Sequence, residues 1–128
     1  MSGFDLTAEQ EQLKAVAAKV AADVYAAPAA RWDLERTSLP REEVARLADL
    51  GYLGLAIPEE YGGQGGTLVD ALVVIEELAK VCRPAAFQVF ECNTGPIRVI
   101  QFFGTVEQKQ RWLTASCLGE QTSAILVS

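Results

Sequence analysis

Few side chains in this chain could carry out acid–base, nucleophilic or metal chemistry. Histidine is absent from all 128 residues. This absence removes the commonest general base, the usual transition-metal ligand and every Ser-His or Cys-His nucleophile pair. Cys82, Cys92 and Cys117 are widely spaced and form no CxxC pair, so we expect three reduced, buried thiols. The sequence therefore predicts no metal site.

The segment 58–66, PEEYGGQGG, is the one turn-rich stretch of the chain. Its four closely spaced glycines permit positive φ angles, and Pro58 fixes the entry into the turn. The spacing is not GxGxxG and no clear strand precedes it, so a dinucleotide-binding loop is not expected. Glu59 and Glu60 are adjacent and should diverge, which disfavours a paired acid and base. We interpret the segment as a solvated turn.

The charge and length of the chain exclude several classes of partner. Eleven basic and 17 acidic residues give 11 − 17 = −6, with no local run of basic residues, so nucleic acid and anionic membrane surfaces are not expected as partners. The longest apolar stretch, residues 68–75, is far shorter than the ~20 residues that span a bilayer. Without a secretory signal pattern, we expect one cytoplasmic domain that does not insert into a membrane.

Three threonines, each followed three positions later by Gln or Asp, predict helix starts. In such a capping box the hydroxyl and the later side chain satisfy amides that the first turn leaves unpaired. Apolar periodicity and the positions of proline and glycine supply the other boundaries, with Pro28 expected to end the first helix. The boxes are Thr7 with Gln10, Thr67 with Asp70, and Thr105 with Gln108, and the predicted helices cover 8–26, 41–50, 68–81, 85–91, 96–103 and 106–118.

The last eight residues, QTSAILVS at 121–128, have a different composition. Their β-branched and apolar residues are typical of a buried strand. A single strand has no partner for its backbone hydrogen bonds. We therefore predict an all-α domain followed by the first strand of a β domain that the chain does not contain.

In this order, these pieces resemble the N-terminal helical domain of the acyl-CoA dehydrogenase family. The resemblance covers essentially the whole chain. It is carried by FDLTAEQEQL at 4–13, GYLGLAIPEEYGGQGGT at 51–67, ALVVIEELAK at 71–80, FGTVEQKQRWL at 103–113 and the terminal strand at 119–128. It implies a helical-bundle domain at 1–119 and the start of the family's middle β domain at 120–128.

The resemblance also implies a function. Members of the family are FAD-dependent oxidoreductases that oxidise the α,β bond of an acyl-CoA thioester. A middle β domain and a C-terminal helical domain complete them, commonly as tetramers. Because the family's catalytic glutamate lies in the C-terminal domain, no carboxylate here inherits its role, and this chain alone is expected to be inactive.

Two groups of residues match family sites. Ile125, Leu126, Val127 and Ser128 match the strand that packs against the flavin, with Ser128 at the position of a flavin-bonding threonine. Phe87, Gln88, Glu91 and Gly95 match positions that line the acyl pocket.

Each group also has a plainer interpretation. Ser128 could be an ordinary strand serine, and Phe87 and Phe90, three apart on a helix, could be ordinary core packing. Glu91 is harder to explain in this way, since an unpaired buried carboxylate is costly.

Two further functions remain open at this point. Acyl-CoA oxidases, nitroalkane oxidases and flavin monooxygenases share this N-terminal domain, and the residues that distinguish them lie in the missing domains. The third possibility is a non-catalytic helical module that binds a partner or an acyl group without flavin. Bound oxidised flavin, visible by its absorbance, discriminates the enzymes from the module.

Overall fold

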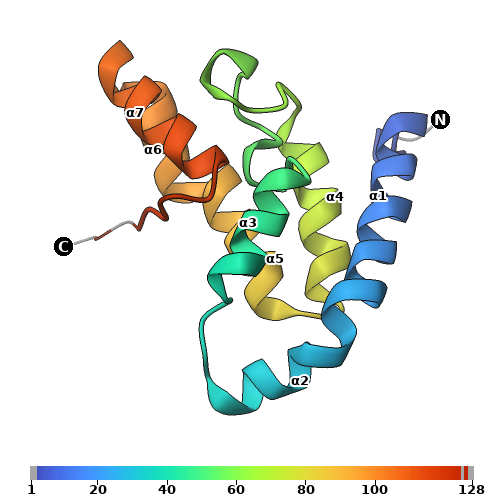
Figure 1. Ribbon diagram of the computed structural model, residues 1–128. Helices are drawn as coiled ribbons and strands as arrows, with labels where there is room; N and C mark the ends of the chain where they lie inside the picture. The colour runs from blue at the N-terminus through green and yellow to red at the C-terminus, as the bar shows by residue number, and fades with distance from the viewer. Residues whose placement is uncertain (1–2, 125, 127–128) are drawn as a thin grey trace.

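The computed structural model describes residues 3–124 and 126, and every regular element in this part of the chain is helical (Figure 1). This confirms the predicted fold class. The α-helices are α1 (Ala8–Val20), α2 (Ala26–Glu35), α3 (Arg41–Asp49), α4 (Leu68–Ala79), α5 (Arg83–Asn93), α6 (Gly95–Phe103) and α7 (Val106–Cys117). A π-helical turn, η1 (Ala21–Tyr25), joins α1 to α2, and two short 3-10 helices, η2 (Tyr52–Gly54) and η3 (Glu59–Tyr61), lie between α3 and α4.

All three predicted capping boxes are present, so α1, α4 and α7 begin where the sequence indicates. At α1 the Gln10 amide donates to Thr7 Oγ1 at 3.1 Å, and Gln10 Oε1 accepts from the Thr7 amide at 3.0 Å. The box at α4 also joins two helices, because Asp70 Oδ1 accepts from Gln10 Nε2 at 3.0 Å. The starts of α1 and α4 are therefore held side by side.

The prediction that Pro28 ends the first helix is wrong. The helical path continues through η1 into α2 and ends at Glu35. Pro28 is the third residue of α2, and a proline near the start of a helix removes few intrahelical hydrogen bonds. The π-helical turn directly before it is a local adjustment of the kind that lets a helix bend without ending. Arg36, with φ 51°, ends α2 instead.

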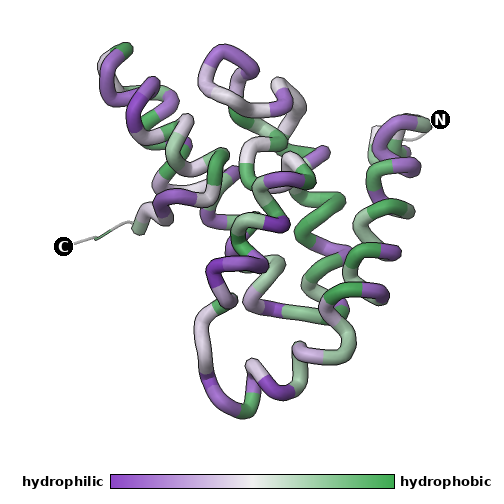
Figure 2. Tube along the Cα trace, in the orientation of Figure 1, coloured by the Kyte–Doolittle hydropathy of each residue, from purple (hydrophilic) through white to green (hydrophobic). Residues whose placement is uncertain are grey.

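The larger hydrophobic core lies where α4 packs between α1 and α5 (Figures 1 and 2). Ala71, Val74 and Leu78 of α4 are fully buried, which confirms the central position predicted for this helix. Leu47 of α3 is also fully buried. In Figure 2 much of the trace of α1 and α4 is green, the colour of hydrophobic residues.

A smaller core joins α6 and α7 to the segment after η2. It consists of Ile57, Ile97, Leu113 and Cys117. The helices α5 and α6 meet at Thr94, whose backbone is extended, and at Gly95, which has φ 39°. The predicted break before Pro96 is thus confirmed, and it turns the chain from the larger core into the smaller one.

The segment after α7 forms no strand at the residues described there, 121–124 and 126. An isolated strand would leave its amides and carbonyls without partners, which accounts for the irregular path. The assignment of 120–128 to a further β domain stays a prediction.

Candidate functional site

The predicted pocket residues of α5 line a groove between α3, α5 and the segment after α7. The groove has a volume of about 490 Å³, and Phe87, Gln88 and Glu91 all contribute to its wall. Because these residues are one turn apart or adjacent on α5, the helix presents them on one side. Residues 119–122 form the opposite wall.

Phe87 is not an ordinary core residue. It is 52% exposed, and its ring stacks on that of Phe90 with centroids 5.7 Å apart and planes 25° apart. Phe90 itself is 41% exposed. The plain-core interpretation of this pair is therefore wrong for the described chain. Phe87, which lines the groove, supplies an apolar surface there, whereas Phe90 does not line it.

Glu91 is partly buried, and no ion pair involves it among the described residues. Burial raises the pKa of its carboxyl group, because loss of water disfavours the charged form. The neighbouring Gln88 joins α5 to the terminal segment: its Nε2 donates to Thr122 Oγ1 at 3.3 Å and to Cys92 Sγ at 3.4 Å. The groove thus has one apolar, one titratable and one hydrogen-bonding group.

Gly95 is not among the residues that line this groove. A Cβ added at Gly95 would meet no heavy atom within 4 Å, so the local reason for glycine is its positive φ rather than a lack of space. The pocket-lining role of Gly95 stays a prediction.

Asn93 is a residue that the sequence analysis missed. It is fully buried. Its Oδ1 accepts from the Ala56 amide at 3.0 Å, and its Nδ2 donates to the carbonyls of Tyr52 and Val89, both at 2.8 Å. These bonds fix the end of α5 against η2 and the segment after it. A lone asparagine directly before the Thr94-Gly95-Pro96 break is the signal that could have found it.

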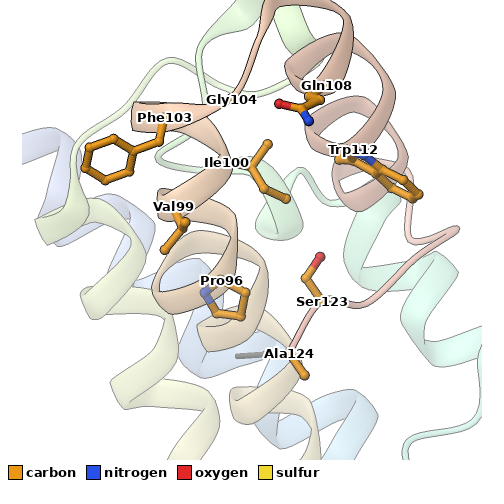
Figure 3. Close-up of a pocket in the computed structure, with 9 residues that line it drawn as sticks. All are labelled: Pro96, Val99, Ile100, Phe103, Gly104, Gln108, Trp112, Ser123 and Ala124. Atoms are coloured by element: carbon orange, nitrogen blue, oxygen red, sulfur yellow. The ribbon is translucent and has the colours of Figure 1, made fainter. Parts of the chain in front are cut away.

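A second, mainly apolar cavity of about 580 Å³ lies between α6, α7 and residues 123–124. Ile100, Gln108, Trp112 and Ser123 surround it, whereas the ring of Phe103 points away (Figure 3). The sequence analysis did not anticipate it, because its walls come from residues that are separated along the chain.

Only a small part of the predicted flavin group can be placed. Ile125, Val127 and Ser128 lie outside the described residues, and Leu126 is 98% exposed. The flavin-contact role of these four residues stays a prediction.

Cys82, Cys92 and Cys117 are buried and form no disulfide. Burial raises the pKa of each, so the reactive thiolate is disfavoured. These cysteines are packing residues, as the sequence predicts.

Comparison with known proteins identifies the family. The family described as "Acyl-CoA dehydrogenase, N-terminal domain" matches residues 7–120. A 3-sulfinopropanoyl-CoA desulfinase of Cupriavidus necator is 38% identical over 98% of this chain and 31% of its own length. A short-chain acyl-CoA dehydrogenase of Clostridium acetobutylicum is 32% identical over 94% of this chain and 32% of its own length.

A solved structure supports the same family. The butyryl-CoA dehydrogenase of Megasphaera elsdenii superposes with a TM-score of 0.82 at 26% identity, covering 94% of this chain and 32% of that one. The chain spans about a third of the length of the curated relatives it matches. No described helix is long and apolar enough to cross a membrane. The match over residues 7–120, together with this fold, shows that the chain belongs to the acyl-CoA dehydrogenase family and corresponds to its N-terminal domain.

Proposed function

We propose that this chain is the N-terminal part of an FAD-dependent oxidoreductase that dehydrogenates the α,β bond of an acyl-CoA thioester. The observation that carries the proposal is the groove on α5, where Phe87, Gln88 and Glu91 meet the segment that leads out of the domain. A family member needs an acyl pocket, and this groove offers an apolar wall next to the point where further domains would follow.

Each groove residue has a distinct role in the proposal. Phe87, stacked on Phe90, provides an apolar surface for the acyl chain. Gln88 holds Thr122 and so fixes the wall opposite α5. Glu91, with its raised pKa, is more easily kept uncharged beside an apolar chain.

The remaining parts of the reaction lie outside the described residues. FAD, when bound, supplies the hydride acceptor, and the residues 125–128 are proposed to lie at the edge of its site. The catalytic base is proposed to come from the further domains, with assembly as a tetramer in the cytoplasm.

A second candidate function is desulfination of an acyl-CoA. The relatives named 3-sulfinopropanoyl-CoA desulfinase are 36–38% identical to this chain, whereas the short-chain acyl-CoA dehydrogenase is 32% identical. A sulfinopropanoyl group carries a negative charge at its distal end. The two candidates share an acyl-CoA substrate and differ in the bond that is broken.

A fusion tests the proposal. The matching third of the Clostridium acetobutylicum enzyme is replaced by this chain, and the purified fusion is examined for retained flavin absorbance and for oxidation of butyryl-CoA with a dye acceptor. Sulfite release from 3-sulfinopropanoyl-CoA is measured in parallel. The chain alone, supplied with FAD, is the control.

We expect the fusion to retain flavin and oxidise butyryl-CoA, and the chain alone to do neither. Sulfite release without dehydrogenation would favour the second candidate. Turnover by the chain alone would show that one of its own carboxylates acts as base. A folded fusion that binds neither flavin nor thioester would support the non-catalytic module instead.

A further inference from the structure

The end of α6 and the start of α7 carry large apolar side chains that the described chain leaves uncovered. Val99, Phe102, Phe103 and Val106 are all at least half exposed. Val99, Phe102 and Phe103 are three and four residues apart on α6, so they share one side of the helix. Ordinary surfaces carry such residues singly, whereas a cluster of them marks an interaction surface. We call these four residues the α6 patch.

The cavity between α6, α7 and residues 123–124 borders this patch. Val99 and Phe103 belong to both. With a volume of about 580 Å³ the cavity has room for an aromatic ring, but the ring of Phe103 points away from it (Figure 3). The same pair of helices thus presents an exposed ring and an open apolar space, and within one chain neither fills the other.

The walls of the cavity suit an apolar guest. None of the described residues that line it is charged, so covering the cavity removes no ion from water. Trp112 contributes an indole ring to the wall (Figure 3), and aromatic rings attract one another beyond the effect of their buried area. The centre of a protein interface has this composition, with few charges and many aromatic side chains.

A second copy of the same chain has both halves of the required contact. In a two-fold symmetric pair the ring of Phe103 from each copy enters the cavity of the other, so the contact is made twice and the assembly closes. A partner that offers only a ring, or only a cavity, would leave one of the two features uncovered. The arrangement therefore favours a copy of this chain over an unrelated partner.

The size of the surface fits a weak dimer. The two phenylalanines of each copy would bring on the order of 600 Å² into the contact, whereas a specific interface buries about 1,200 Å² or more. Val99, Val106 and the walls of the cavity have to supply the rest. The net charge of −6 on each chain opposes association, and salt screens this repulsion.

From this arrangement we infer that two copies of the chain associate through α6 and α7, with Phe103 of each copy seated in the cavity of the other. The inference goes beyond the proposed function, because it requires neither flavin nor a thioester. It concerns α6 and α7, whereas the proposed function depends on the groove on α5.

The test removes the ring and fills the cavity in separate variants of the full chain. Phe103→Gln removes the ring, and Ser123→Phe places a bulky side chain in the cavity wall. Neither residue is buried, so both variants should fold. Leu34→Gln on α2 is the matched control, since Leu34 and Phe103 are both 84% exposed.

Two measurements follow the association. Sedimentation equilibrium gives the mass over a concentration range of about 10 to 1,000 μM, in which weak interfaces dissociate. Nuclear magnetic resonance follows the indole N–H signal of Trp112, which lines the cavity. The signal of Trp32 on α2 serves as the internal control.

We expect the mass to approach twice that of one chain at the highest concentration, more closely in high salt, and the Trp112 signal to shift with concentration while that of Trp32 stays constant. Phe103→Gln and Ser123→Phe should each weaken the dimer at least about tenfold, as expected for the central aromatic contact of an interface. Leu34→Gln should leave it unchanged.

An equal mixture of Phe103→Gln and Ser123→Phe provides the sharpest test. Neither variant can form the contact with itself, but the mixture retains one ring and one open cavity. The mixture should therefore associate more tightly than either variant alone. A surface that is merely adhesive would show no such recovery.

A chain that stays monomeric over the whole range overturns the inference, and the α6 patch would then be left to another part of a longer polypeptide. It is also overturned if Leu34→Gln weakens the dimer as much as Phe103→Gln, or if the mixture associates no better than its components. Urea midpoints verify that the variants are folded, and if one is not, the comparison of the other with Leu34→Gln decides. Dehydrogenation by the fusion is measured separately and depends on none of these outcomes.

Discussion

The region of α1, α4 and α5 and the region of α6 and α7 use their apolar residues differently. In the first, α4 packs on both neighbours and its residues Val74 and Leu78 are fully buried. In the second, Phe102 is 65% exposed and Phe103 is 84% exposed, and only four buried residues form the core. The first region therefore has the larger buried core. The second region leaves large apolar side chains exposed to solvent within the described chain.

The largest expected difference is between leucine truncations in the two cores. Leu78→Ala should lower the free energy of unfolding by about 4 kcal/mol, because α1 and α5 enclose the cavity. Leu113→Ala should cost about 2 kcal/mol, because the small core can relax toward solvent. Both leucines are fully buried, so urea unfolding of the two variants compares the regions directly. Equal losses would contradict the proposed difference.

Asn93→Ala should have the next largest effect and lower the free energy of unfolding by about 3 kcal/mol. It removes a side chain that bonds Ala56, Tyr52 and Val89, and it leaves a buried amide and carbonyls unsatisfied. Gln88→Ala, on the same helix, is the control and should cost less than about 1 kcal/mol, since its amide makes longer bonds at a less buried site. Similar urea midpoints for the two variants would show that Asn93 does not hold η2 in place.

Helix starts were predictable because their signals are local. A threonine and the residue three positions later are neighbours in any helix, so Thr7, Thr67 and Thr105 needed no tertiary information. The central position of 68–81 followed from its apolar circumference for the same reason. Pro28 shows where local signals fail, since a π-helical turn upstream let the helix continue past it.

The sites were predictable only in part. The spacing of Phe87, Gln88 and Glu91 predicts that they lie on one side of one helix. The resemblance to the family identified them as candidates for lining a pocket. The partners across the groove come from residues 119–122, and a further pocket is lined by residues of both α2 and α5. Such pairings depend on the path of the chain between distant segments. Asn93 was missed because two of its three partners, Ala56 and Tyr52, are set by tertiary packing.

Substitutions at Gly95, where the two regions join, should change the free energy of unfolding by a smaller amount. Gly95→Ala should cost about 1 kcal/mol, because the positive φ of 39° disfavours any residue with a Cβ, although space for the methyl group is available. Gly95→Asn should cost less, because asparagine tolerates this conformation. If both variants lose the same stability in urea, the cause is contact rather than backbone conformation.

The smallest expected effect on stability depends on pH and arises at Asp70, at the start of α4 in the first region. Asp70 Oδ2 accepts from the Thr67 amide at 2.7 Å, and this bond, opposed by burial and assisted by the bond from Gln10, lowers the pKa of the carboxyl group below its ordinary value of 3.8. The folded state thus favours the charged form. The stabilisation is fully present above the unfolded pKa and is lost as the pH falls through the folded one.

Asp70→Ala should therefore cost about 1 kcal/mol at neutral pH, the usual size of a lost cap, and the cost should shrink as the pH falls below 3.8. Gln108→Ala removes the corresponding neutral side chain from the box at α7 and should have a cost that does not change with pH. Urea unfolding at several acidic pH values, with each variant compared with the unmodified chain, measures both. A cost at Asp70 that is independent of pH would mean that the carboxylate's charge does not hold α1 and α4 together. The cap at α4 would then act through hydrogen bonds that do not depend on the charge of Asp70.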